Sequence, residues 1–322
     1  MVSNVNLAAR GMLFCLLVCL AINTKVFALD KKESSALSHF IMAGMYDSLG
    51  DMDKAIAEYQ QALNSDLDSA SIHLNLAASF IRKGELDKAA AELKATIKLD
   101  PQAAEPHAIL AVLYSSRGKP EEADVEYESA LKNASRIHPK NIEIYKALGE
   151  LYLRQRNLVS AESTYRLIID LTPNDAEAHF YLANIYEEQA DMRKTEEELK
   201  KALELKPDYP EALNYLGYVY VEENKNLPQA EVMLKKALEF EPDNGAYVDS
   251  LGWLYFKKGN LKESLQQLER AVNLLEDPTI YDHLGDVYLK AGNKEKAKDS
   301  WLNSLRLDPE QKDVEKKLKG LK

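Results

Sequence analysis

A period of 34 residues is the feature of this sequence that most constrains its fold. Small residues, histidines and prolines all recur at this step. The series are Gly50, Gly84 and Gly118; Ala55, Ala89 and Ala123; His39, His73 and His107; and Pro139, Pro173 and Pro207. A fixed period of 34 residues is the length of one helix-turn-helix unit of an α-solenoid. The 13 glycines and 11 prolines of the 322-residue chain are then mostly turn residues of repeated units.

Fixed positions within each unit resemble the tetratricopeptide repeat (TPR) family. The family unit has a small residue at position 8, Tyr at 11, Gly at 15, Ala at 20, a large residue at 24, Ala at 27 and Pro at 32. The first repeat follows it with Ala43, Tyr46, Gly50, Ala55 and Tyr59. Eight such repeats cover residues 36–309, and they begin near Ala36, Ala70, Ala104, Ile142, Ala176, Pro210, Gly245 and Pro278.

Several repeats depart from the family pattern, the third, fourth and sixth among them. Pro139 arrives four residues late after the third repeat, so its second helix or the exit from it is extended. The fourth repeat has Arg156 where Gly is usual, and the sixth has one extra residue in the turn Glu223–Leu227. These departures affect turns and leave the helical pattern intact.

The resemblance implies an all-α fold, a right-handed α-solenoid of about eight helix-turn-helix units. Small residues at positions 8 and 20 allow the two helices of a unit to approach closely, and large residues at 11 and 24 fill the space between them. Helices of about 13 residues are marginal alone, so we expect one array instead of two domains. Residues 29–35 are expected to be a short polar linker, and residues 310–322 a capping helix with Val314, Leu318 and Leu321 on its inner face.

The N-terminus carries the pattern of a secretory signal peptide. The apolar run Met12–Ile22 follows Arg10 and is too short to span a bilayer, which needs about 20 residues. We therefore expect residues 1–28 to be removed after Ala28, which places the mature chain in the periplasm without cysteine. Lipidation at Cys19 is the alternative, with anchoring at the outer membrane. Soluble export is favoured because Val18 precedes Cys19, where a lipoprotein signal has a small residue.

Charge and motif content exclude several functions. The chain has 41 Lys and Arg against 52 Asp and Glu; without Arg10 and Lys25 the count is 39 against 52, a net charge of −13. Such an excess of acid argues against nucleic-acid binding, which needs clustered basic residues. No nucleophile-elbow or phosphate-loop pattern is present. The sequence therefore predicts no enzymatic activity and no cofactor.

The histidines do not indicate a metal site. Four of them, at position 4 of their repeats, are His39, His73, His107 and His179. Zinc sites usually draw ligands from short spacings such as i and i+4, which this pattern lacks. We interpret position 4 as a packed position between repeats that accepts a flat side chain.

The TPR resemblance places a protein-binding surface on the first helix of each unit. In the family, positions 2, 5, 6, 9, 12 and 13 of that helix line a concave groove that holds peptides or partner helices. In the C-terminal half these positions combine aromatic and acidic residues, which suits a basic, partly apolar segment. The candidate binding residues are Tyr181, Asn184, Tyr215, Tyr218, Asp249, Trp253, Phe256, Asp282 and Asp286.

The residues at these positions leave one question open and exclude one familiar mode of binding. Trp253 and Phe256 either anchor a ligand or pack adjacent helices, and the pattern does not separate the two roles. The carboxylate clamp that some TPR proteins use for chaperone tails is missing, because Asn184 is accompanied by Phe180 at position 5 and Tyr215 follows at position 6 of the next repeat.

The segment Asp243–Gly259, together with Tyr281–Gly285, resembles a bacterial group of exported TPR proteins that act as envelope scaffolds or adaptors. The expected function is a non-enzymatic adaptor that binds a protein partner in the periplasm or at the outer membrane. The alternative is a self-associating structural or assembly factor of a secretion or pilus-type machinery.

Overall fold

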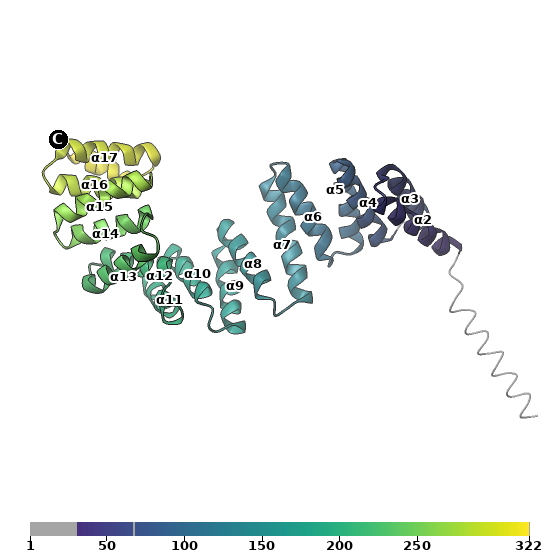
Figure 1. Cartoon of the computed structure of the whole chain (residues 1–322), viewed down its shortest axis with the longest axis horizontal. Coiled ribbons are helices and arrows are strands. Elements are labelled where there is room, and N and C mark those ends of the chain that lie inside the picture. Colours follow the sequence, from purple (N-terminus) through teal and green to yellow (C-terminus); the bar gives the residue numbers. More distant parts are fainter. Residues whose placement is uncertain (1–30, 67, 322) are drawn as a thin grey trace, which may run out of the picture. The chain divides into compact units, whose positions relative to one another are not determined.

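The computed structural model describes residues 31–66 and 68–321, and these residues form helices and turns without any strand (Figure 1). The proposed signal peptide, residues 1–28, lies outside the described part of the chain. None of the described helices is long and apolar enough to cross a membrane. The all-α architecture of consecutive helix-turn-helix units is confirmed.

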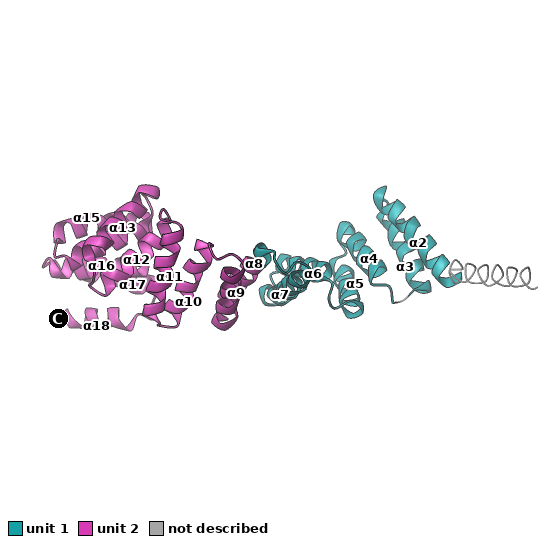
Figure 2. Cartoon of the chain, turned by 90° about the horizontal axis from the view of Figure 1, so that it is seen from below, with its two compact units in different colours: residues 1–144 teal, residues 145–322 magenta. Residues whose placement is uncertain are grey.

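The chain divides into two compact units, residues 1–144 and residues 145–322 (Figure 2). The division falls within α8, just after the repeat whose proline is delayed. Helices of residues 31–154 are α2 (Lys31–Ser48), α3 (Met52–Ser65), α4 (Ala70–Lys83), α5 (Leu86–Leu99), α6 (Ala104–Ser116), α7 (Pro120–Ile137) and α8 (Ile142–Arg154). Those that follow are α9 (Leu158–Leu171), α10 (Ala176–Glu188), α11 (Met192–Leu205), α12 (Pro210–Glu222), α13 (Leu227–Phe240), α14 (Gly245–Lys257), α15 (Leu261–Leu274), α16 (Pro278–Lys290), α17 (Lys294–Leu307) and α18 (Lys312–Gly320).

The turn within each repeat requires a left-handed residue. Gly84 at the end of α4 has φ 81°, and Gly292 after α16 has φ 84°, a conformation that glycine adopts without steric cost. The fourth repeat places Arg156 there with φ 54°, and the extra residue of the sixth repeat gives Asn224 and Asn226, both with φ 50°. Non-glycine residues in this region cost about 1–3 kcal/mol, so these turns depend on the packed helices around them.

Close helix contact explains the small residue at position 8. A Cβ atom on Gly149 would lie 2.7 Å from Cζ of Tyr165, and one on Gly252 would lie 2.8 Å from Cγ of Leu268. Both larger residues occupy position 24 of the same repeat, and both are buried. The first and second helices of a unit therefore meet where a small residue faces a large one. Tyr127, at position 24 of the third repeat, differs because it is 40% exposed.

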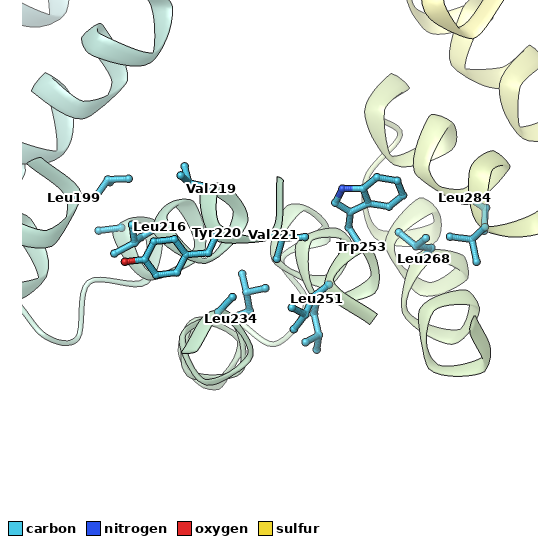
Figure 3. Packing of buried hydrophobic residues seen from close by; sticks show 14 of the residues in the cluster. Leu199, Leu216, Val219, Tyr220, Val221, Leu234, Leu251, Trp253, Leu268 and Leu284 are labelled. Carbon is cyan, nitrogen blue, oxygen red and sulfur yellow. The ribbon is translucent and has the colours of Figure 1, made fainter. Parts of the chain in front are cut away.

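Each unit has its own hydrophobic core. In residues 31–144 the core includes Tyr59, Leu76, Phe80, Leu93 and Leu110. In residues 145–322 the core runs through α10 to α18, and Figure 3 shows its central part. The labelled residues of that part are Leu199, Leu216, Val219, Tyr220, Val221, Leu234, Leu251, Trp253, Leu268 and Leu284.

The segments before and after the repeats were expected to be a linker and a helix, and both contain helix in the structure. Residues 31–35 belong to α2, so the expectation of a linker over 29–35 is wrong for them. Lys, Glu and Ser without Gly or Pro do not stop a helix, and Ala36 behind them is buried. At the other end α18 lies within residues 310–322, with Val314 only 2% exposed and Leu318 packed against the same core.

Candidate protein-binding surface

The first helices of the sixth, seventh and eighth repeats, α12, α14 and α16, contact one another in sequence. Their residues at positions 2, 5, 6, 9, 12 and 13 form a surface that we call the A-helix face. A hollow of about 330 Å³ opens on this face. Its lining residues come from all three helices and from the turn before α16: Asn214, Tyr215, Tyr218, Ala246, Asp249, Ser250, Leu275, Asp277, Thr279 and Ile280.

Trp253 lies beside the hollow and is buried, with only 7% of its surface exposed. Its ring stacks on His283 of α16 at a centroid distance of 4.0 Å and on Phe256 at 4.7 Å. The indole N–H donates a hydrogen bond to the carboxylate of Glu222 on α12. Trp253 therefore joins three helices, which favours the packing role that the sequence left open over a role as an exposed anchor.

Asp249 and His283 form a buried ion pair between α14 and α16. The Nδ1 atom of His283 lies 2.9 Å and 3.1 Å from the two carboxylate oxygens of Asp249, and each residue is 6% exposed. Burial by itself lowers the pKa of His283, but the charge and hydrogen bond of Asp249 outweigh it, and the pKa is raised. Both carboxylate oxygens of Asp249 therefore already have a partner within the chain.

Asp282 and Asp286 also have a partner within the chain. The ammonium of Lys317 on α18 lies 2.7 Å and 2.8 Å from the carboxylate oxygens of Asp282 and 2.8 Å from Oδ2 of Asp286. Burial opposes the charge on Lys317, but the two aspartates outweigh it and raise the pKa of Lys317. These two carboxylates, expected to face a basic ligand, already hold a basic side chain of the C-terminal helix.

Tyr215 and Tyr218 are the candidate residues that both line the hollow and remain partly exposed. Burial raises the pKa of Tyr218, and the negative charges of Glu222 and Asp249 raise it further. The electrostatic potential at this tyrosine is therefore negative, which disfavours an anionic ligand.

Tyr181 and Asn184 of α10 are not among the residues that line the hollow. Tyr181 stacks on Tyr165 with ring centroids 4.9 Å apart, and Phe180 contacts Tyr215 edge-on at 6.3 Å. The structure thus gathers Tyr215, Tyr218 and Asp249 at the hollow, whereas the other candidates do not line it.

The position-4 histidines pair with carboxylates of the same repeat, and two of them, His107 and His179, are buried. In each case Nδ1 of the histidine lies 2.6 Å from a glutamate oxygen 19 residues further on. The pairs are His39–Glu58, His73–Glu92, His107–Glu126 and His179–Glu198. The constant spacing from position 4 to position 23 was the sequence signal that could have revealed them. The described residues contain no group of three or more His, Cys, Asp or Glu side chains placed to bind a metal.

Sequence reasoning also missed Asn214, Ser250 and Lys317. Helix α18 begins at Lys312, which is 34 residues after Pro278, so Lys317 occupies position 6 of a ninth, incomplete unit. The same count places Asn214 at position 5 and Ser250 at position 6 of their repeats. Continuing the repeat numbering past residue 309 would have placed Lys317 beside the acidic pair.

Family models described as tetratricopeptide repeat match residues 46–104, 114–185, 186–252, 249–276 and 278–311. No curated protein matches the sequence significantly.

Two solved structures show the same fold at low identity. One is a tetratricopeptide repeat protein from Parabacteroides merdae, with 21% identity and a TM-score of 0.55 over 78% of this chain and 98% of that one. The other is a chain of the APC/C hetero-tetramer Cut9–Hcn1, with 18% identity and a TM-score of 0.57 over 87% of this chain and 54% of that one. At these identities the likeness concerns the fold alone.

Proposed function

Because the chain belongs to the tetratricopeptide repeat family, whose members generally mediate protein–protein interactions, we propose that it is a non-enzymatic adaptor that binds a segment of a protein partner on the A-helix face of residues 145–322. The observation that carries the proposal is the hollow between α12, α14 and α16, with Tyr215 and Tyr218 on its wall. Partly exposed tyrosines in a hollow are typical of residues that dominate binding energy.

The charge of this face selects the class of partner. Four carboxylates, those of Glu222, Asp249, Glu187 and Asp282, raise the pKa of Tyr218 beyond the effect of burial. Lys317 of α18 binds Asp282 and Asp286, which shows that this face accepts a basic side chain. Both observations support a basic, partly apolar segment as the ligand.

The adaptor is proposed to act in the bacterial periplasm, after removal of residues 1–28. Support comes from the sequence alone, in the charge-free run Met12–Ile22 and the small-residue site that ends at Ala28. Mass spectrometry of the protein isolated from an envelope fraction tests it. A mature N-terminus at Leu29 is the expected result; an acylated Cys19 would replace soluble export with outer-membrane anchoring, and an intact Met1 would contradict export.

Binding is tested by capture from an envelope extract with the mature chain as bait. We expect Tyr218→Ala to remove the captured partner and Tyr215→Ala to weaken its capture, because both rings line the hollow. Tyr127→Ala is the matched control, since it removes a 40% exposed tyrosine from α7. Full capture by both hollow variants would contradict the proposed surface.

Self-association is the second candidate function, and an exposed apolar stripe on α2 and the turn after it favours it. The stripe consists of Leu37, Ile41, Met45 and Leu49, which are 47%, 54%, 60% and 77% exposed. Large exposed apolar surface often marks an interface. Light scattering of the mature chain separates the two functions. An oligomer that Ile41→Lys dissociates would support self-association, and a monomer would leave the adaptor function as the remaining candidate.

A further inference from the structure

At the last two steps of the array, a cation bridges consecutive first helices between the same two positions. The residue at position 5 of one repeat meets the residue at position 6 of the next. Asp249 of the seventh repeat pairs with His283 of the eighth at 2.9 Å. Asp282 of the eighth repeat pairs with Lys317 of the incomplete ninth unit at 2.7 Å. At these two steps a carboxylate of one helix is satisfied by a cation of the following helix.

The preceding step has neither the carboxylate nor the cation. The sixth repeat has Asn214 at position 5, and the seventh has Ser250 at position 6. The hydroxyl of Ser250 donates to the carbonyl of Ala246, 3.0 Å away in its own helix, and so does not serve Asn214. The side-chain oxygen of Asn214 is buried without a hydrogen-bond partner. A buried acceptor without a donor costs about 1–3 kcal/mol, so this oxygen favours any donor that can reach it.

The hollow lies at this incomplete step. Asn214 and Ser250 both line it, and its volume of about 330 Å³ falls within the range of small-ligand sites, about 300–1,000 Å³. None of its lining residues is Lys, Arg or His. Ser250 is small where the next two units carry His283 and Lys317, which leaves space beside Asn214.

The lining of the hollow offers acceptors and aromatic faces. Asp249 and Asp277 contribute carboxylates, and Tyr215 and Tyr218 contribute rings. Asp277 uses one oxygen to cap α16, accepting from the backbone N–H groups of Thr279 and Ile280. Several acceptors around an aromatic wall suit a planar guanidinium, which has five donors in a fixed fork and stacks on rings.

We propose that the hollow between α12, α14 and α16 binds one arginine side chain of the partner segment, which donates to the buried oxygen of Asn214 that Ser250 leaves without a donor. The terminal torsion of an asparagine is broad, so the amide of Asn214 can turn its oxygen toward the guanidinium. This inference rests on the proposed adaptor function and names the side chain of the partner segment that the A-helix face recognises.

Peptide binding to the mature chain tests the arginine directly. The probe is an acetylated and amidated Gly-Leu-Arg-Leu-Gly peptide, and its matched controls carry citrulline or lysine in place of arginine. Chemical-shift titration of the backbone amides should show shifts at Asn214 and Ser250. Affinity should be about tenfold higher for arginine than for citrulline, because the charge strengthens each hydrogen bond. Equal affinity for citrulline overturns the requirement for a cation, and equal affinity for lysine overturns the requirement for a guanidinium.

Filling the hollow from within gives an independent test. Ser250→Arg should place a guanidinium of the chain itself in the hollow and abolish binding of the arginine peptide. Ser163→Arg adds the same charge at an exposed serine of α9 and should leave peptide binding unchanged. Circular dichroism reports whether each variant is folded, and if Ser250→Arg is not, the citrulline comparison on the wild-type chain still decides the proposal.

Capture from an envelope extract separates this inference from the adaptor function. A partner that is lost with Tyr218→Ala but retained with Ser250→Arg would overturn the arginine site and leave the adaptor function standing. If wild-type protein captures nothing while the arginine peptide binds as expected, the result contradicts the adaptor function and supports arginine binding in the hollow.

Discussion

Replacing Trp253 by alanine should destabilise the protein by about 3–5 kcal/mol, the usual cost of removing a large buried aromatic side chain. The indole is 7% exposed and stacks on His283 and Phe256 at centroid distances of 4.0 Å and 4.7 Å. The substitution removes both stacking contacts and opens a cavity between α12, α14 and α16. Glu222 also loses a donor, but its side chain is 44% exposed, so water replaces that hydrogen bond at little cost.

Urea unfolding followed by far-ultraviolet circular dichroism measures this loss, because the signal does not depend on tryptophan fluorescence. Trp253→Phe keeps an aromatic ring in the stack and should cost about 1–2 kcal/mol. Tyr127→Ala, at a 40% exposed tyrosine, is the matched control and should cost clearly less than Trp253→Ala.

A loss below about 1 kcal/mol for Trp253→Ala would refute the packing role. Combined with a loss of partner binding of about 2 kcal/mol or more, it would assign Trp253 to the ligand as an exposed anchor. Binding by a folded Trp253→Ala protein that is indistinguishable from wild type would instead show that the ring contributes to stability alone.

Three further changes test the contacts around this face. Because Asp249 raises the pKa of His283, the pair stabilises the fold fully below pH 6.5, and this stabilisation is lost as the pH rises through the raised pKa. Asp249→Asn should lower the pKa of His283, measured by NMR titration, and should reduce the loss of stability with rising pH. Lys317→Met leaves Asp282 and Asp286 without their cation. Because these ion pairs are partly solvated, the substitution should lower the free energy of unfolding in urea by about 1–3 kcal/mol. No measurable loss would mean that the packing of α18 does not depend on the ion pairs. Gly285→Ala would place a Cβ atom against the indole of Trp301 and should cost about 1–3 kcal/mol, so an unchanged Tm would show that the indole can move aside.

The repeat register could be predicted from the sequence because its signals are local. The left-handed glycines at Gly84 and Gly118 and the alternation of small and large residues recur at 34-residue steps, and each acts within one unit. Helices accordingly begin at Ala70 and Ala104, where the sequence places repeats. Residues 31–35 escaped prediction because the end of a pattern does not show whether a helix continues beyond it.

The candidate site could be predicted only as a set of residues that share a face. Tyr215, Tyr218 and Asp249 do meet at one hollow, as their positions in the repeat suggest. Which candidates are already occupied was not predictable, because the rotamers and spacing of side chains on neighbouring helices decide it. Lys317 reaches the two aspartates only once α18 packs as a ninth first helix.

The sequence by itself determined the α-helical repeat, the turn residues and the aromatic and acidic character of one face, since these depend on residue type and spacing along the chain. Only the tertiary structure decided that Trp253 is buried, that His283 and Lys317 neutralise carboxylates of the preceding repeats, and that Ser250 leaves a hollow. Each of these depends on distances between helices of different repeats, and such distances follow from how whole units pack, which a pattern repeated along the chain does not encode.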